Sequence, residues 1–264
     1  MPELPDLEAF RRYVDATALH QPISGVQVKA PAVLKDIGPE ELRRELVGNR
    51  FQSTARYGKR LFSGLEDDRW LTLHFGMTGE LKYFRDLEDE PEYDRLLISF
   101  QNGYHLAYLS RRKLGEVRLI EDWEDFVQSK DLGPDALDLQ EEDFFELLSD
   151  RRGMIKSALM DQQLIAGIGN IYSDEILFQA GVHPRAQVQD LRPEVISRIF
   201  ASMQEALQEA IADQANPTEF PPHYLTPHRG PEEKCPRCET PLEKIKVSGR
   251  GAYFCPACQG AGGQ

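Results

Sequence analysis

The chain has 264 residues, of which 41% are hydrophobic and 28% charged, so it is long enough for two domains and has an ordinary globular composition. Its formal net charge of −13 argues against a simple nucleic-acid binder, because phosphate contacts require Lys and Arg. There is no apolar signal region and no apolar run long enough to span a bilayer, so we expect a cytoplasmic protein without a membrane partner.

In chain order, the residue patterns predict helices and strands first and helices alone afterwards. Helices are expected over 3–20 and 38–48, and strands over 26–30, 70–76, 95–100 and 116–120. Asn102-Gly103 predicts a hairpin with a type I′ turn. Later helices are expected over 122–130, 141–150, 153–160, 170–180 and 193–214, followed by a proline-rich linker. We therefore divide the chain into domains at 1–121, 122–225 and 226–264.

The charges are unevenly distributed along the chain. Acidic residues gather in 86–94, 121–125 and 138–146, whereas basic residues gather in 56–60, 111–118, 151–156 and 244–250. An acidic protein can carry one basic groove, although a run of charge is more often only a solvated face. The charge pattern alone leaves both interpretations open.

The first residues, "MPELPDLE", have two interpretations. Pro2 and Pro5 suit the first turn of a helix, and the acids Glu3, Asp6 and Glu8 complement the positive end of its dipole. A helix start therefore accounts for them without any chemistry. Alternatively, removal of the initiator methionine leaves Pro2 with a free secondary amine, which is a potential nucleophile.

The four cysteines form two pairs near the C-terminal end. Cys235 and Cys238 are separated from Cys255 and Cys258 by sixteen residues, and each pair has the C-x-x-C spacing. Four thiolates at this spacing suit one tetrahedral structural zinc ion with no open position, whereas redox-active pairs are the alternative. The residues between the two pairs predict a hairpin with Gly249 and Gly251 near its tip.

The segment 164–181, "LIAGIGNIYSDEILFQAG", predicts a helix preceded by glycines. Asn170 stands at the expected N-cap and Gly181 at the C′ position. Glycines before a helix N-terminus let backbone amides approach an anion, so the segment suits a phosphate. A plain turn between helices has the same pattern.

Together these motifs resemble one family. "PELP", "GKRL", "LHFGMTGEL", "RRKLG", "GIGNIYSDEILFQAGVHP" and "CPRC…GRGAYFCPAC" occur in the order found in the formamidopyrimidine-DNA glycosylase / endonuclease VIII family of base-excision repair enzymes. The resemblance covers 2–258. It implies an α+β multidomain fold: an N-terminal β-sandwich with flanking helices, a helical domain with a helix–two-turns–helix motif, and a zinc finger. It also implies a monomer that binds damaged double-stranded DNA in the bacterial nucleoid.

The resemblance implies a bifunctional DNA glycosylase and AP lyase. The amine of Pro2 attacks the sugar C1′ atom, a Schiff base forms, and elimination cuts the strand. Glu3 matches the family's acid/base carboxylate. Lys59 matches the lysine that holds phosphate beside the lesion and assists elimination, whereas without the resemblance it is an exposed strand lysine.

Other positions match the family's DNA contacts. Asn170 and Arg250 match residues that contact the phosphate backbone, and arginine suits that role through bidentate hydrogen bonds. The residues that fill the gap left by an extruded base are matched by Met77, Arg111 or Arg112, and Leu114. Glu175 and Asp6 match carboxylates near the base pocket. Simple core packing is the alternative for Met77, and a solvent-facing position is the alternative for Glu175.

Three departures from the family pattern leave the lesion unresolved. Asp6 replaces a glutamate, Leu114 replaces an aromatic residue, and the linker 217–231 is shorter than the loop that caps 8-oxoguanine in some members. An AP lyase or adduct specialist with weak 8-oxoguanine activity is therefore one alternative. A catalytically inactive damaged-DNA-binding scaffold is another. The scaffold is disfavoured by the joint retention of five family residues: Pro2, Glu3, Lys59, Asn170 and Arg250.

Overall fold

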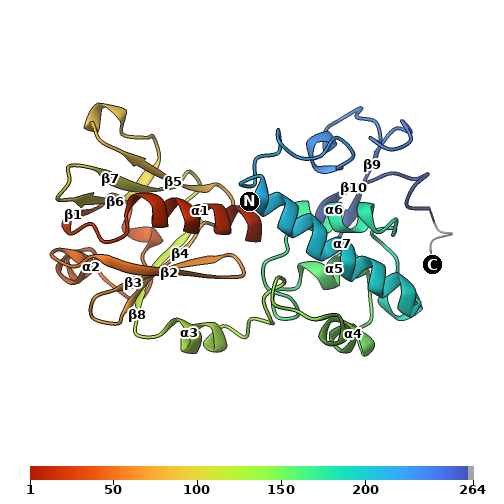
Figure 1. Cartoon of the computed structure of the whole chain (residues 1–264), viewed down its shortest axis with the longest axis horizontal. Helices are drawn as coiled ribbons and strands as arrows, with labels where there is room; N and C mark the ends of the chain where they lie inside the picture. Colours follow the sequence, from red (N-terminus) through yellow and green to blue (C-terminus); the bar gives the residue numbers. More distant parts are fainter. Residues whose placement is uncertain (261–264) are drawn as a thin grey trace. The chain divides into compact units, whose positions relative to one another are not determined.

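The computed structural model describes residues 1–260, and contacts between Cα atoms divide the chain into two units (Figure 1). Unit 1 comprises Met1–Pro2 and Asp6–Asp131, and unit 2 comprises Glu3–Pro5 and the chain from Leu132 onward. Leu4 and Pro5, the first two residues of helix α1 (Leu4–Thr17), therefore belong to unit 2, whereas the rest of the helix belongs to unit 1. Within 1–260, no helix is both long and apolar enough to cross a membrane.

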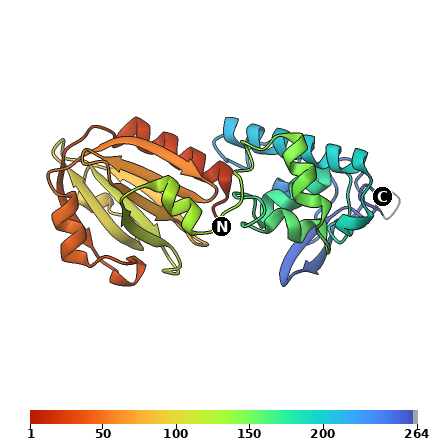
Figure 2. The same ribbon diagram turned by 90° about the horizontal axis from the view of Figure 1, so that it is seen from below.

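Unit 1 is a sandwich of two four-stranded antiparallel sheets (Figure 2). The first sheet has the order β1 (Ile23–Val28), β6 (Asp94–Phe100), β7 (His105–Ser110) and β5 (Gly79–Phe84). The second has the order β2 (Phe51–Tyr57), β3 (Arg60–Leu65), β4 (Trp70–His74) and β8 (Glu116–Ile120). Leu61 and Leu73 of one sheet share a core with Ile98 and Leu106 of the other, which confirms the predicted sandwich.

Three helices pack with the sandwich. Leu7 and Val14 of α1, with Leu42 and Leu46 of α2 (Pro39–Leu46), complete its core. Helix α3 (Trp123–Ser129) packs on the second sheet, where the rings of Trp123 and Phe62 are 5.6 Å apart. The helix predicted at 122–130 thus packs with the strands and not with the later helices. Short 3₁₀ turns lie at Pro31–Val33 and Leu87–Asp89.

The hairpin between β6 and β7 is confirmed, but its predicted turn type is wrong. A type I′ turn needs positive φ at both central residues, and here Gly103 has φ +81° whereas Asn102 does not. The Gly103 N–H donates to the Phe100 carbonyl at 3.1 Å, and the Phe100 N–H donates to the Tyr104 carbonyl at 2.9 Å. These bonds define a three-residue loop that ends in a glycine bulge.

Unit 2 consists of packed helices and one hairpin. The helices are α4 (Glu141–Ser149), α5 (Ile155–Met160), α6 (Asn170–Gln179) and α7 (Pro193–Ala212), with 3₁₀ turns at Val188–Asp190 and Thr226–His228. The hairpin pairs β9 (Glu243–Val247) with β10 (Arg250–Phe254). Its turn is Ser248-Gly249, with φ +47° and +78°, so the type I′ geometry occurs at this hairpin. The helices predicted in this region are confirmed to within a few residues.

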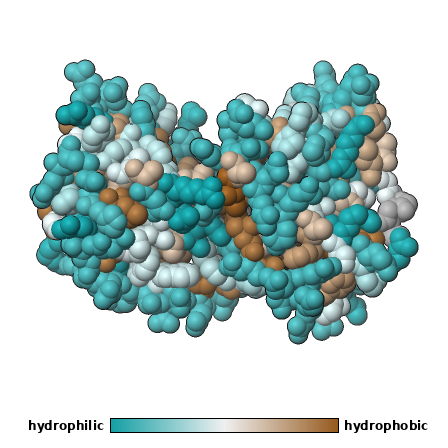
Figure 3. All heavy atoms as spheres, viewed as in Figure 1, coloured by the Kyte–Doolittle hydropathy of each residue, from teal (hydrophilic) through white to brown (hydrophobic). Residues whose placement is uncertain are grey.

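Helix α6 lies at the centre of unit 2. Every residue from Tyr172 to Phe178 is buried, so the helix has no solvent-facing side over that stretch. It ends as predicted: Gly181 has φ +67°, and the Val182 N–H donates to the Leu177 carbonyl at 2.9 Å. Hydrophilic residues cover most of the molecular face in Figure 3. The polar residues Ser173, Asp174 and Glu175 of α6 are instead buried, so they must find hydrogen-bond partners within the protein.

Candidate functional site

The Glu3 carboxylate caps the N-terminus of α6 from the other end of the chain. Oε2 accepts from the N–H groups of Gly169 at 2.8 Å and Tyr172 at 3.1 Å, and Oε1 accepts from the Ile171 N–H at 2.8 Å. Only 1% of Glu3 is exposed. A carboxylate at this helix end satisfies N–H groups that lack partners within the helix and complements its dipole.

Two predictions about this turn are therefore wrong. Asn170 is not the N-cap, since α6 begins at Asn170 and Gly169 precedes it. The amides expected to bind phosphate are taken by Glu3. A Cβ on Gly169 would lie 2.3 Å from the Glu3 carboxyl carbon, so this glycine makes room for the protein's own carboxylate.

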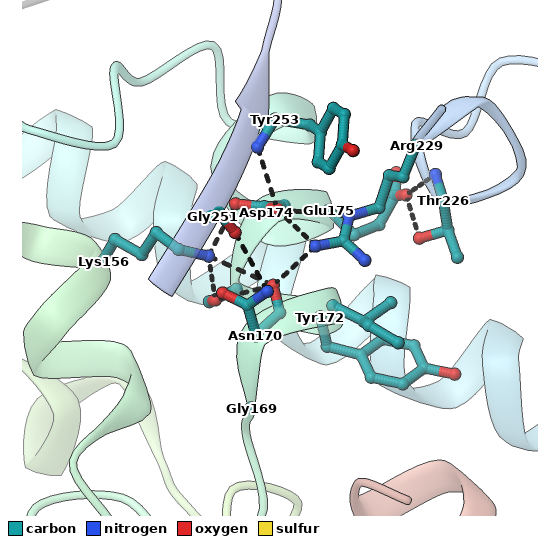
Figure 4. A network of polar contacts seen from close by, with 12 residues as sticks. Lys156, Gly169, Asn170, Tyr172, Asp174, Glu175, Thr226, Arg229, Gly251 and Tyr253 are labelled. Carbon is teal, nitrogen blue, oxygen red and sulfur yellow. Dashed lines mark hydrogen bonds and ion pairs between the residues drawn. The ribbon is translucent and has the colours of Figure 1, made fainter. Parts of the chain in front are cut away.

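The Asn170 side chain contacts the hairpin instead. Its Nδ2 atom donates to the Gly251 carbonyl at 3.0 Å, directly after Arg250 (Figure 4). Arg250 opens β10 opposite Val247 and is exposed. The Ser248 hydroxyl at the hairpin turn lies 2.6 Å from the Ser157 hydroxyl. The exposed arginine therefore stands on a hairpin that is bonded to the helices on both sides of its tip.

Glu175 is fully buried, so the solvent-facing alternative is wrong. Its carboxylate accepts from the Leu225 N–H at 3.1 Å and from the Thr226 N–H and hydroxyl at 2.7 and 2.6 Å. Gln179 donates a further bond at 2.7 Å. Glu175 thus fastens the linker that follows α7 to helix α6.

Asp174 is the centre of a buried ion network that the sequence did not reveal (Figure 4). Its Oδ1 atom lies 2.6 Å from the Lys156 ammonium, and Oδ2 lies 2.7 Å from the Arg229 guanidinium. The Tyr253 N–H also donates to Oδ2 at 3.1 Å. The only available signal was Ser173-Asp174-Glu175 inside an otherwise apolar helix, where polar side chains need partners.

The four cysteines are close enough to share one metal ion. All four sulfur atoms lie within 4.8 Å of one another, and those of Cys235 and Cys258 are 3.8 Å apart. The Sγ atoms of Cys238 and Cys255 are 3.5 Å apart. Zinc–sulfur bonds of about 2.3 Å in a tetrahedron place sulfur atoms about 3.8 Å apart, so the donors fit zinc.

In unit 1, Lys59 lies in the turn between β2 and β3. The expectation that Lys59 lies on a strand is therefore wrong. The next residue, Arg60, pairs with His74 of β4 and lies 3.3 Å from the Glu116 carboxylate. Burial, together with the charge of Arg60, lowers the pKa of His74 to about 4. Lys59 thus adjoins a group of partly buried ionisable side chains in which His74 is neutral at pH 7.

Met77 and Leu114 are exposed apolar residues on two touching turns. They are 45% and 50% exposed, so core packing does not account for Met77. A Cβ on Gly76, beside Met77, would lie 2.6 Å from the Leu114 carbonyl carbon. Arg112 lies 3.1 Å from the Met77 sulfur, whereas the guanidinium of Arg111 lies 5.3 Å from the centre of the Tyr93 ring. The geometry therefore groups Arg112, and not Arg111, with Met77 and Leu114.

Pro2 and Asp6 flank the buried Glu3 in the sequence. Pro2 is half-buried and directly precedes Glu3. Asp6 lies in the first turn of α1 and is also half-buried. The arrangement places a proline, whose nitrogen becomes a terminal amine once Met1 is removed, next to a carboxylate fixed by three backbone N–H groups.

Three family profiles match the chain along most of its length. They are described as the formamidopyrimidine-DNA glycosylase N-terminal domain over residues 1–117, the formamidopyrimidine-DNA glycosylase H2TH domain over 132–221, and a zinc finger found in FPG and IleRS over 232–260. The matched parts correspond to the sandwich, the helices and the cysteine-bearing hairpin. They define the class of protein: a DNA glycosylase of base-excision repair.

Individual relatives agree with these profiles. The chain is 33% identical to a formamidopyrimidine-DNA glycosylase of Streptococcus mutans, over 98% of this chain and 99% of the relative. It is 34% identical to one from Lactococcus lactis subsp. cremoris with the same coverage. A crystal structure of the Lactococcus lactis enzyme with DNA containing an abasic site matches with a TM-score of 0.87 and 32% identity, over 98% of this chain and 99% of that one. The chain belongs to the formamidopyrimidine-DNA glycosylase / endonuclease VIII family.

Proposed function

We propose that this protein both excises a damaged base from double-stranded DNA and cuts the strand as an AP lyase, with the amine of Pro2 as nucleophile. The observation that carries the proposal is the carboxylate of Glu3, held by three backbone N–H groups directly beside Pro2 in the chain. A fixed carboxylate next to a terminal amine is the pair that Schiff-base chemistry at a sugar carbon requires.

The proposed reaction begins when the neutral Pro2 nitrogen forms a bond to C1′ and the bond from C1′ to the base breaks, with its electron pair leaving on the base, which takes a proton from water. Glu3 takes the proton that the amine loses and returns it to the ring oxygen O4′ as the C1′–O4′ bond opens. The product is an iminium ion between Pro2 and C1′. It withdraws electrons, so water takes a proton from C2′ and the C3′–O3′ bond breaks, with the 3′-phosphate as the leaving group. Water then hydrolyses the iminium ion and releases Pro2.

DNA is the proposed partner, with contacts in both units. Relatives support it, since structures of the Lactococcus lactis enzyme contain DNA with an abasic site or with Fapy-dG. In unit 2, exposed Arg250 is suited to a phosphate, and Asn170 fixes the strand that carries it. In unit 1, Lys59 is the proposed contact to the phosphate beside the lesion. We assign the insertion into the duplex to Met77, Leu114 and Arg112, because exposed apolar side chains on turns suit an intercalating wedge.

We propose zinc as the metal of the four cysteines, since their sulfur separations suit its tetrahedral geometry. The four cysteine thiolates would fill every coordination position of such an ion, which would supply structure to the hairpin and no chemistry at the sugar. Its proposed contribution is to keep Arg250 at the tip of an ordered hairpin.

The linker after α7 favours a particular range of lesions. Glu175 holds Leu225 and Thr226 against α6, which leaves little of 217–231 to close over an extruded purine. Without that cap, fewer hydrogen bonds distinguish 8-oxoguanine from guanine, and each such contact is worth about 1–3 kcal/mol. We therefore propose that abasic sites, ring-opened formamidopyrimidines and oxidised pyrimidines are processed faster than 8-oxoguanine opposite cytosine.

Single-turnover kinetics on duplexes with one lesion each test this function. We expect base release and strand cleavage on formamidopyrimidine duplexes, and cleavage alone on abasic duplexes. Base release without cleavage would contradict the lyase, and binding without either reaction would identify an inactive scaffold. If 8-oxoguanine opposite cytosine were excised fastest, the linker argument would be wrong while the activity stood.

A further inference from the structure

The buried carboxylate of Asp174 joins three segments that are distant in the sequence. Its four short contacts come from Lys156 of α5, Arg229 of the linker and Tyr253 of β10. Asp174 has no exposed surface, and neither does Lys156. A buried ion pair is costly to desolvate and is weak evidence for stability, so its geometry is the more informative property.

The same network reaches the residues that hold Glu3. Lys156 donates to the Asn170 carbonyl at 3.1 Å and to the Ser173 hydroxyl at 2.7 Å. Burial lowers the pKa of Lys156, while the negative charges of Asp174 and Glu3 oppose that shift. The first turn of α6 thus lies between two carboxylates. Glu3 accepts hydrogen bonds from its N–H groups, and Asp174 pairs with the Lys156 ammonium, which donates to the Asn170 carbonyl.

The network also fixes the hairpin that carries Arg250. Tyr253, whose N–H bonds to Asp174, is three residues beyond Arg250 on β10, a span of about 10 Å along a strand. The Arg229 guanidinium lies 5.3 Å from the centre of the Tyr253 ring, so it approaches β10 as well as Asp174. The Asn170 amide completes the attachment at Gly251.

We propose that Asp174 is a positioning residue that fixes the Arg250 hairpin relative to the Glu3 carboxylate, so that one phosphate contact and the reaction centre keep a constant separation. The inference rests on the proposed role of Arg250 as a phosphate contact. Asp174 itself touches neither DNA nor the reacting atoms. Its effect on DNA should therefore pass through Arg250.

A double-mutant cycle measures that dependence. The variants are Asp174→Asn, Arg250→Ala and both together, and the readout is the Kd for a duplex with a tetrahydrofuran abasic-site analogue over a range of salt concentrations. We expect each single variant to bind about tenfold more weakly, which corresponds to one lost charge-assisted contact. The double variant should bind within about twofold of Arg250→Ala, and all three should lose about one unit of salt slope.

The neighbouring buried carboxylate provides the matched control. Glu175→Gln alters a carboxylate on the same helix, α6. This carboxylate bonds to Leu225 and Thr226 of the linker and not to the hairpin. Any loss of affinity in this variant should multiply with that of Arg250→Ala. If the Asp174→Asn and Arg250→Ala losses also multiplied, Asp174 would have only a general structural role and the inference would be overturned.

Two further outcomes are distinguishable. If Arg250→Ala alone left the Kd and salt slope unchanged, the proposed role of Arg250 would fail, and the inference about Asp174 with it. If Asp174→Asn did not fold, the Lys156→Met/Asp174→Asn variant would replace it in the cycle, because it removes the buried cation together with its carboxylate. The same non-multiplicative result is expected, and multiplicative losses would again overturn the inference.

Discussion

The candidate residues in the two units differ in how firmly they are held. In unit 2, Glu3 and Asn170 are fixed by hydrogen bonds to backbone groups of α6 and β10. In unit 1, Met77 and Leu114 are about half exposed on turns. Groups that move protons or set distances need fixed geometry, whereas groups that enter a duplex must remain accessible at some cost in exposed apolar surface. Under the proposed function, the fixed side chains of Glu3 and Asn170 suit the proton transfer and the spacing of the hairpin, and the exposed side chains of Met77 and Leu114 suit insertion into the duplex.

Replacing Glu3 should have the largest effect on activity. Glu3→Gln keeps the size of the side chain but loses the proton acceptor, so base excision should fall by about 10²–10⁴-fold. Loss of a charged helix cap should lower the free energy of unfolding by about 1–2 kcal/mol. Single-turnover rates and denaturant unfolding measure the two effects separately. Glu8→Gln is the control, because it removes a partly buried carboxylate of α1 that pairs with Arg11 and Arg12. An excision rate for Glu3→Gln within threefold of wild type would refute the role of Glu3.

In unit 1, the partly buried His74 should make the stability of the protein depend on pH. Its pKa is about 4 in the folded protein and about 6.5 when unfolded. Below pH 6.5 the unfolded chain binds a proton that the folded chain does not, so stability falls as the pH decreases towards 4. The shift is worth up to about 3 kcal/mol. The free energy of unfolding of His74→Asn should decline less over this range, and parallel pH profiles for both proteins would contradict the prediction.

Removal of the metal should affect the hairpin selectively. A chelator, or Cys238→Ser, should disorder the hairpin and weaken DNA binding by at least the loss seen for Arg250→Ala. Metal content and Kd, measured on the same samples, test this expectation. Because unit 1 carries none of the four ligands, its near-ultraviolet spectrum should be retained. Metal-free protein with unchanged affinity would show that the hairpin does not need the ion.

Arg250→Ala should weaken DNA binding about tenfold with almost no change in thermal stability, because the side chain is exposed. The salt slope should decrease by about one unit, as expected for one lost phosphate contact. Arg250→Lys retains the charge without the bidentate geometry and should recover the slope but only part of the affinity. A lower melting temperature combined with an unchanged slope would contradict a phosphate contact.

The smallest expected effect belongs to the wedge. Leu114→Phe introduces a ring that stacks on bases, worth about 1 kcal/mol, so binding to a stably paired lesion should improve about fivefold. Because Leu114 is half exposed, the free energy of unfolding should change by less than about 0.5 kcal/mol. Kd values on 8-oxoguanine and abasic duplexes test whether the gain is larger for the stacked base. Equal gains would contradict the wedge interpretation.

Local spacing predicted the cysteine site and most of the helices and strands, whereas the β-sandwich and the helix–two-turns–helix domain were predicted through the family resemblance. The sequence could not show that Glu3 caps α6, because Glu3 and Gly169 are 166 positions apart in the chain. The partners of Asp174 also come from distant segments, and only folding brings them together. The choice between Arg111 and Arg112 depended on which one faces Met77, which a pair of adjacent arginines does not reveal. Local patterns therefore identified residue types, and tertiary contacts assigned the partners.

Borohydride trapping on abasic DNA directly tests whether the amine of Pro2 is the nucleophile. Protein from which Met1 has been removed should yield a covalent complex whose DNA-linked peptide begins at Pro2, and Pro2→Gly, which keeps an amine, should retain part of the yield. A form that retains Met1 should yield none, because the proline nitrogen is then part of a peptide bond. Undiminished trapping with Met1 present, or an adduct on Lys59 or Lys156, would show that Pro2 is not the nucleophile.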